Sequence, residues 1–159
     1  DMVFSPGAIS AGLKAIKQGK NIVVDSSMVK AGLNKNIIAR FKNKIICRMH
    51  DKDVARKAGE LNLTRAIVAM RKSQRETNGG IVAIGNAPTA LFELCDLIKE
   101  AKSKPALVVG IPVGFVGAAE SKRALRALKI PYITNKSRKG GSTVAAAIVN
   151  ALLILAKGK

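Results

Sequence analysis

Five short apolar runs, separated by stretches of helical periodicity, constrain the fold of this chain more than any other feature. The runs are residues 22–24, 45–47, 81–84, 106–111 and 132–134. Because they are continuous rather than alternating in polarity, they are typical of strands buried on both faces of a parallel sheet. The remaining periodicity predicts helices over residues 27–33, 64–76, 88–101, 120–128 and 142–156. Ser5 and Pro6 predict the N-cap and first residue of an earlier helix.

Strands that alternate with helices favour a three-layer α/β/α domain with a mostly parallel five-stranded sheet, doubly wound and flavodoxin-like. Residues from the hydrophobic set make up 48% of the chain, which argues against disorder. No internal repeat, linker or low-complexity segment divides the sequence. We therefore expect one domain that spans residues 1–159.

This fold class also predicts where a ligand binds, because ligands lie beyond the carboxyl ends of the strands, near a topological switch point. The segments that follow the apolar runs are residues 25–27, 48–51, 85–89, 112–117 and 135–142. Most of the unusual glycines, prolines and polar side chains fall in these segments. The sequence therefore predicts a site at this edge of the sheet.

Residues 85–89, with the sequence Gly-Asn-Ala-Pro-Thr, join a strand to a helix. In one interpretation Gly85 takes a strained turn, and free backbone N–H groups accept a carboxylate or phosphate beside the Asn86 amide. In the other, this is an ordinary turn in which Asn86 caps the helix. Spacing alone does not separate the two.

Residues 110–117 hold glycines at 110, 114 and 117, which is neither the dinucleotide fingerprint nor a phosphate-binding P-loop. A nucleotide site is therefore unsupported. The backbone here can approach a large flat ligand, with Phe115 available to lie against it. Lys122, which follows, either pairs with an acid group of a ligand or faces solvent.

Residues 136–142 combine three cations, two glycines and the start of the last helix. On physical grounds this combination favours an anion site. The alternative is a basic turn on the surface.

The chain has 28 Lys and Arg residues against 10 Asp and Glu residues, a formal net charge of +18. Such an excess predicts an anionic partner, which can be nucleic acid, an acidic membrane face or a polycarboxylate small molecule. A surplus of lysine for solubility is the remaining explanation. Basic runs such as residues 40–44 suggest a nucleic-acid-binding domain, but few aromatic residues are available for base stacking.

The residues that could carry metal or proton chemistry are few. His50 is the only histidine and follows the second apolar run, so it is a weak candidate for a general acid. Cys47 and Cys95 are isolated, so we predict no metal site and reduced thiols in a cytoplasmic protein. Residues 144–156 are interrupted by Asn150 and are shorter than the roughly 20 residues of a membrane span, so we expect no membrane partner.

Taken together, these segments resemble the precorrin-8X methylmutase family, which includes the cobalt-precorrin-8 methylmutases. The specific matches are residues 84–91, IGNAPTAL, and residues 110–122, GIPVGFVGAAESK. Weaker matches are residues 4–6, Asp25, residues 28, 29 and 32, Thr64 with Arg65, and the 138–142 turn before an Ala-rich helix with Asn150. Their order is that of the family, and they span nearly the whole chain.

The resemblance implies an isomerase that moves a methyl group from C11 to C12 of a corrin precursor, giving hydrogenobyrinic acid or cobyrinic acid. It implies a 1,5-sigmatropic shift assisted by a protonated histidine, with no cofactor. It also implies a homodimer, with the macrocycle bound near the subunit boundary. The substrate is a polycarboxylate macrocycle, which agrees with the basic charge, and nucleic acid is then not a partner.

The resemblance also assigns roles by position. A turn that holds the ligand's side chains would comprise Gly85, Asn86 and Thr89. The ring face would lie on Gly114, Phe115 and Val116, with Ser121 and Lys122 behind them. Carboxylates would bind Arg138, Gly140, Gly141 and Ser142, with Arg48, Thr64 and Arg65 as weaker candidates.

One departure from the family pattern bears on catalysis. The family's catalytic histidine and a substrate-binding arginine lie upstream of the Phe-Ser-Pro segment, with which this sequence begins. We therefore expect that the chain lacks its N-terminal segment, and His50 does not occupy the place of that histidine. A non-catalytic corrinoid-binding protein is the alternative that this departure leaves open.

Overall fold

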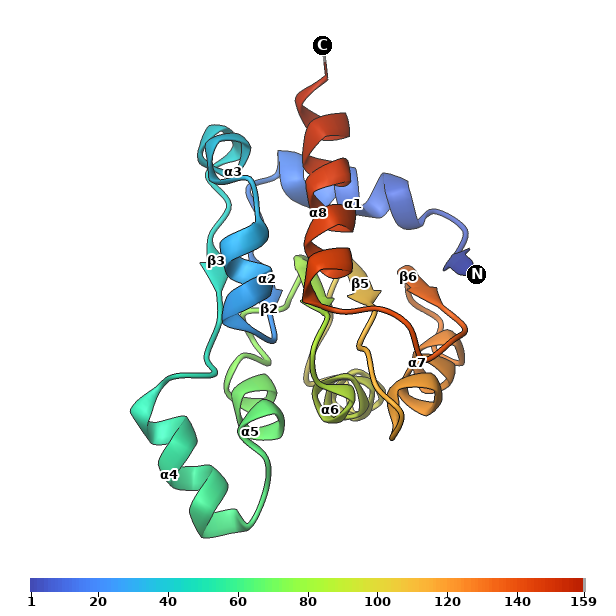
Figure 1. Ribbon diagram of the computed structural model, residues 1–159. Helices are drawn as coiled ribbons and strands as arrows, with labels where there is room; N and C mark the ends of the chain where they lie inside the picture. The colour runs from blue at the N-terminus through green and yellow to red at the C-terminus, as the bar shows by residue number, and fades with distance from the viewer. Residues whose placement is uncertain (159) are drawn as a thin grey trace.

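The computed structural model describes residues 1–158, and a six-stranded sheet lies at its centre (Figure 1). Its strands are β1 (Met2–Phe4), β2 (Ile22–Val24), β3 (Ile45–Ile46), β4 (Ile81–Ile84), β5 (Leu107–Gly110) and β6 (Tyr132–Asn135), in the order β1-β6-β5-β4-β2-β3. β2 to β6 are parallel, and their order is that of a flavodoxin-like doubly wound sheet. The expected fold class is therefore confirmed.

The sixth strand, β1, was not expected. It pairs antiparallel with β6, with Val3 opposite Thr134. Ser5 was predicted to cap a helix, and this is wrong: its hydroxyl accepts the Tyr132 N–H at 2.7 Å, and Gly7, at φ 76°, precedes the helix instead. A three-residue edge strand has too few residues to show a pattern in sequence.

The helices form two layers. One face of the sheet is covered by α1 (Ala8–Lys17), α2 (Ser27–Gly32), α3 (Lys35–Phe41) and α8 (Ser142–Lys157), and the other by α5 (Arg65–Lys72), α6 (Pro88–Lys99) and α7 (Ala118–Arg126). α4 (Lys52–Leu61) packs on α5 and stands away from the sheet. The sequence did not predict α3 or α4, although α3 buries Ile37 and Ile38 in the core and α4 buries Val54 and Ala58 against α5.

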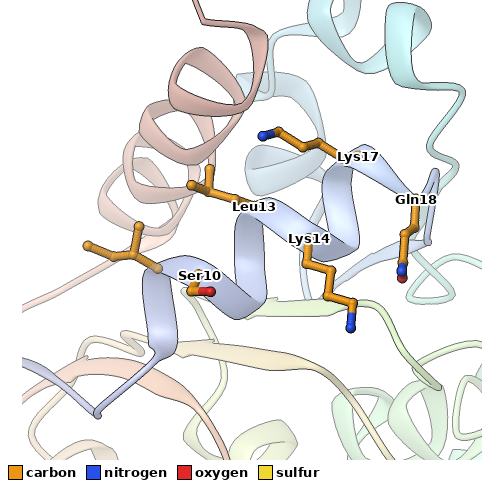
Figure 2. Close-up of a pocket in the computed structure, with 6 residues that line it drawn as sticks. Ser10, Leu13, Lys14, Lys17 and Gln18 are labelled. Atoms are coloured by element: carbon orange, nitrogen blue, oxygen red, sulfur yellow. The ribbon is translucent and has the colours of Figure 1, made fainter.

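Helix α1 carries a shallow hollow of about 530 Å³ on its outer side (Figure 2). Its lining residues all come from this helix and its C-cap: Ile9, Ser10, Leu13, Lys14, Lys17 and Gln18. On its inner side α1 packs closely, because a Cβ at Gly12 would lie 2.9 Å from a methyl group of Leu107, at the start of β5. The hollow therefore belongs to the amino-terminal side of the sheet.

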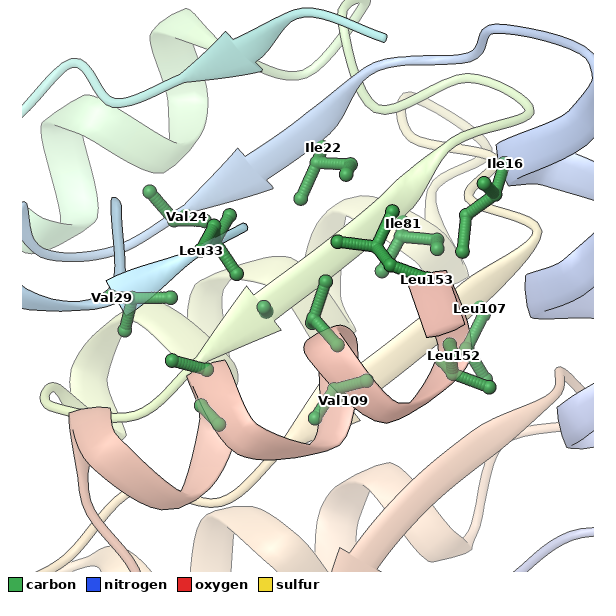
Figure 3. Packing of buried hydrophobic residues seen from close by; sticks show 14 of the residues in the cluster. Ile16, Ile22, Val24, Val29, Leu33, Ile81, Leu107, Val109, Leu152 and Leu153 are labelled. Carbon is green, nitrogen blue, oxygen red and sulfur yellow. The ribbon is translucent and has the colours of Figure 1, made fainter. Parts of the chain in front are cut away.

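Helix α8 lies across the middle of one sheet face and organises the larger core. Val149, Leu152 and Leu153 are buried against Ile81 and Leu107 of the central strands (Figure 3). The helix begins at the carboxyl edge of β4, where Gly85 packs against it. A Cβ at Gly85 would lie 2.6 Å from Ser142 Cα and 2.8 Å from Gly141 O. The absence of a side chain at residue 85 thus sets how closely α8 approaches the sheet.

We expect Gly85→Ala to lower the free energy of unfolding by about 1–3 kcal/mol, because the neighbouring atoms are backbone and α8 has to move. Gly59→Ala in α4 is the matched control, since nothing lies within 4 Å of a Cβ there. It should stabilise the helix by about 0.5–1 kcal/mol. Urea unfolding measures both, and equal effects of the two substitutions would contradict the close approach.

Candidate functional site

The topological switch point of the sheet lies between β2 and β4, and Asp25 occupies it. Asp25 follows β2 directly and is 3% exposed. Its Oδ1 accepts the Gly85 N–H at 2.9 Å, and its Oδ2 accepts the N–H groups of Asn86 and Ala87 at 2.9 and 2.7 Å. Burial raises the pKa of the Asp25 carboxyl, and these three hydrogen bonds oppose that rise.

The structure supports neither of the two interpretations of the 85–89 turn. The backbone N–H groups that an external anion would use are already satisfied from inside the protein. Asn86 does not cap α6 through its side chain either, since the N-cap residue is Ala87 and no side chain bonds there. The Asn86 side chain is exposed and Thr89 is half-buried, so both are free to meet a ligand above the turn.

The 111–117 and 136–141 loops are joined to each other above β5 and β6. The Gly141 N–H donates to Ile111 O at 2.9 Å, and the Gly114 N–H donates to Arg138 O at 3.1 Å. Gly140, at φ 150°, packs its Cα side onto the Ile111 carbonyl, where no Cβ fits. Ser142, at the start of α8, shares a 2.9 Å hydrogen bond with Ser26, which links this pair of loops to the end of β2.

Beside the joined 111–117 and 136–141 loops, two apolar side chains are exposed to solvent. Phe115 is 86% exposed and Val116 is 89% exposed. A small pocket of about 220 Å³ lies next to them, lined by Val113, Gly114, Phe115, Arg138 and Lys139. Apolar and aromatic surface flanked by exposed cations suits a flat ligand with acidic substituents.

Lys122 was expected either to pair with an acid group of a ligand or to face solvent, and its environment differs from both of these interpretations. It is 0% exposed, and its Nζ donates to Ser137 O at 2.8 Å and to Lys139 O at 2.6 Å. Burial, and to a lesser extent the charge of Arg126, lowers the pKa of Lys122 to about 8. Ser121 is also buried and donates to Ala118 O at 2.9 Å. Neither side chain reaches the surface of the site.

Thr64 and Arg65 lie at the start of α5, close to the start of α6. Thr64 caps α5 by accepting the Ile67 N–H at 3.2 Å, and its hydroxyl lies 3.5 Å from that of Thr89. Arg65 is exposed beside them. The structure thus brings together two hydroxyls that lie 25 residues apart in sequence, and an exposed cation follows one of them in the chain.

Arg48 differs from Arg65 because acidic side chains already hold it. Its Nε donates to one carboxylate oxygen of Glu76 at 3.1 Å and its Nη2 to the other at 2.7 Å, with Asp51 at 3.6 Å. A guanidinium in a bidentate pair has little capacity left for a second carboxylate. Arg48 therefore supports the β3 segment in this structure.

His50 lies at the same edge, after β3, and is exposed. Its Nε2 forms a 2.9 Å hydrogen bond with Ser27 Oγ at the start of α2. Among residues 1–158, no group of three His, Cys, Asp or Glu side chains is arranged to hold a metal ion, and no helix combines the length and apolarity needed to cross a membrane. Cys47 and Cys95 are free, and burial raises the pKa of the Cys95 thiol to about 12.

Sequence reasoning undervalued two residues that build this edge, Asp25 and Ser26. One signal was available for Asp25: an acidic residue directly after a buried strand is unusual in so basic a chain. The Ser26–Ser142 contact joins residues that are 116 positions apart, and no local pattern indicates such a pair.

The fold and this edge define a doubly wound α/β protein with a basic, partly aromatic surface at the carboxyl edge of the sheet. A sequence profile described as precorrin-8X methylmutase matches residues 1–155. The chain belongs to the precorrin-8X methylmutase family, whose members are isomerases of cobalamin biosynthesis.

Individual relatives agree with this assignment. The chain is 56% identical to a cobalt-precorrin-8 methylmutase of Priestia megaterium, an alignment that covers 98% of this chain and 69% of the relative. It is 46% identical to a precorrin-8X methylmutase of Pseudomonas aeruginosa, over 96% of this chain and 74% of the relative. The crystal structure of a precorrin-8X methylmutase from Thermus thermophilus superposes with a TM-score of 0.90 at 40% identity, covering 98% of this chain and 76% of that one.

We expect Asp25→Asn to lower the free energy of unfolding by about 2–4 kcal/mol, because an amide NH₂ would face backbone donors that the carboxylate now accepts. Asp96→Asn on the exposed side of α6 is the matched control and should change stability little. Urea unfolding followed by circular dichroism measures both. If the two variants unfold alike, Asp25 is not the residue that holds β2 and β4 together.

Proposed function

We propose that this chain binds precorrin-8X or cobalt-precorrin-8 at the carboxyl edge of the sheet and moves a methyl group from C11 to C12 of the macrocycle. The products would be hydrogenobyrinic acid or cobyrinic acid. The observation that carries the proposal is the edge itself, where exposed Phe115 and Val116 lie beside the exposed cations Arg138 and Lys139. The net charge of +18 adds an attractive field for a ligand with many carboxylates.

In this proposal the macrocycle lies flat on Gly114, Phe115 and Val116. Its acidic substituents extend in two directions. One set meets Arg138, Gly140, Gly141 and Ser142, and the other meets Asn86, Thr64, Arg65 and Thr89. The 3.5 Å approach of the Thr64 and Thr89 hydroxyls supports the second group, because both then face one substituent. Arg48 and the buried Ser121 and Lys122 support these segments from behind.

The reaction requires little covalent chemistry from the protein. In a 1,5-sigmatropic shift the methyl carbon leaves C11 as it bonds to C12, and the electrons rearrange within the conjugated ring. The protein's contribution is to hold one ring conformation and to stabilise the charge that develops. A protonated side chain beside the ring serves the second task. We assign His50 no direct part in it, because Ser27 holds its Nε2 at 2.9 Å.

We also propose a homodimer in the cytoplasm. The pocket at the edge is about 220 Å³, smaller than the roughly 300–1,000 Å³ of typical ligand pockets. A macrocycle on this surface would stay open to solvent on one side, and a second copy supplies the missing wall. Two free thiols support a reducing compartment. Light scattering coupled to gel filtration tests the dimer, and a monomer at micromolar concentration would refute it.

A visible-absorption titration with hydrogenobyrinic acid tests the binding proposal. A stoichiometric spectral change that survives added salt and an excess of DNA duplex supports a specific site. Binding to phosphate backbones, in contrast, weakens steeply with salt. No spectral change, together with salt-sensitive DNA binding, would favour a nucleic-acid-binding function.

In the same titration we expect Arg138→Gln to weaken corrinoid binding about tenfold, because a charge-assisted hydrogen bond to a carboxylate contributes about 1.5–3 kcal/mol. The matched control is Lys17→Gln on the outer side of α1, which removes the same charge far from the edge. Equal weakening by both variants would indicate a general field effect rather than a contact. Turnover of the tetrapyrrole substrate then distinguishes an enzyme from a corrinoid-binding protein.

A further inference from the structure

Lys122 is the largest fully buried side chain of the described residues, and no step of the proposed reaction uses it. It projects from α7 beneath the 136–141 loop. Its ammonium lies 2.8 Å from Ser137 O and 2.6 Å from Lys139 O, and these two carbonyls are its hydrogen-bond partners. No acidic side chain among residues 1–158 forms an ion pair with it.

Such a burial is costly, because removing an ammonium from water carries a large penalty unless it is well bonded. A methionine of similar length would fill the same space at no such cost. The lowered pKa of Lys122, about 8, reflects this penalty. The geometry indicates what is gained: the two bonds fix a loop that has no regular secondary structure.

The two bonded carbonyls flank Arg138. Ser137 and Lys139 turn their carbonyl groups inward to the ammonium, and the Asn135 side chain also donates to Lys139 O at 3.0 Å. Arg138 lies between them and is exposed, while its own carbonyl accepts the Gly114 N–H at 3.1 Å. The backbone of Arg138 is therefore held by hydrogen bonds at Ser137, at Lys139 and at its own carbonyl. The side chain that carries the guanidinium thus extends from a fixed position.

We propose that Lys122 is a positioning residue whose buried ammonium holds residues 137–139, and so presents Arg138 to a carboxylate of the ligand. Lys122 would then act on the ligand only through Arg138, unlike the direct pairing with an acid group that was one interpretation of the sequence. This inference rests on the proposed function for the identity of the ligand. The state of the loop can be measured without any ligand.

The first test is hydrogen exchange in the free protein. Lys122→Met removes both donors and preserves length, and Arg123→Met removes one charge from the exposed neighbouring position on α7. In Lys122→Met we expect amides of the 136–141 loop and Gly114 to exchange at least about tenfold faster, since two charge-assisted bonds are lost. Amides of β4 should keep their protection, and Arg123→Met should match the native protein.

The second test is the hydrogenobyrinic acid titration with the same variants. Lys122→Met should bind about tenfold more weakly, as expected of Arg138→Gln, and Arg123→Met should bind normally. The double variant Lys122→Met/Arg138→Gln should bind no more weakly than Arg138→Gln alone, because the two residues act through one contact. Additive weakening in the double variant would overturn the proposal.

Three results separate this proposal from the proposed function. Unchanged loop exchange in Lys122→Met overturns the role of Lys122, and so does acceleration spread equally over the loop and β4. If the native protein does not bind the corrinoid, the proposed function is overturned, but the hydrogen-exchange result still tests the role of Lys122. If Lys122→Met does not fold, Lys122→Gln, which retains two neutral N–H donors on a shorter side chain, decides by the same exchange measurement.

Discussion

The architecture of this protein depends on one buried carboxylate. Asp25 lies where the strand order reverses, and there two parallel strands end in loops that lead away to opposite faces of the sheet. At such a point backbone N–H groups converge with no strand partner, and unsatisfied donors in a buried place cost free energy. By accepting three of them, Asp25 keeps the 85–87 backbone in one conformation. Gly85 can then approach α8, and the Ser26–Ser142 contact closes the same edge.

The sequence predicted the interior of the fold well, for a physical reason. Strands buried on both faces must be apolar throughout, so each of the five parallel strands could be recognised as an apolar run. The predicted bounds agree with the observed ones to within one or two residues. Features that depend on distant partners stayed hidden. β1 forms by pairing with β6, and α4 packs on α5 rather than on the sheet. Ser5 illustrates the same limit, because its acceptor role depends on Tyr132 rather than on the helix that follows.

The fold class predicted where the site lies. The residue types predicted less completely which side chains are available to contact a ligand there. The carboxyl-edge rule identified the segments that follow the strands, but it did not identify Thr64 and Arg65, which lie at the start of α5. The rule could not predict which polar groups remain available to a ligand after the hydrogen bonds within the protein have formed. Arg48 and Arg138 were both expected to bind carboxylates, Arg48 as the weaker candidate, yet Glu76 holds Arg48 whereas Arg138 is exposed. Lys122 reads as a surface cation, and only the position of the 136–141 loop shows that it is enclosed.

The carboxylate at the switch point also has a consequence for selectivity. A nest of converging backbone donors is the natural trap for a compact anion such as inorganic phosphate. Here Asp25 already accepts the N–H groups of residues 85–87, so these donors are not available to a small anion. A ligand that carries several carboxylates around one rigid ring gains from many weak contacts at once, since each attachment raises the local concentration of the next. If the proposed ligand binds here, the edge would favour multivalent anions over simple ones, because a buried side chain of the protein occupies the converging backbone donors.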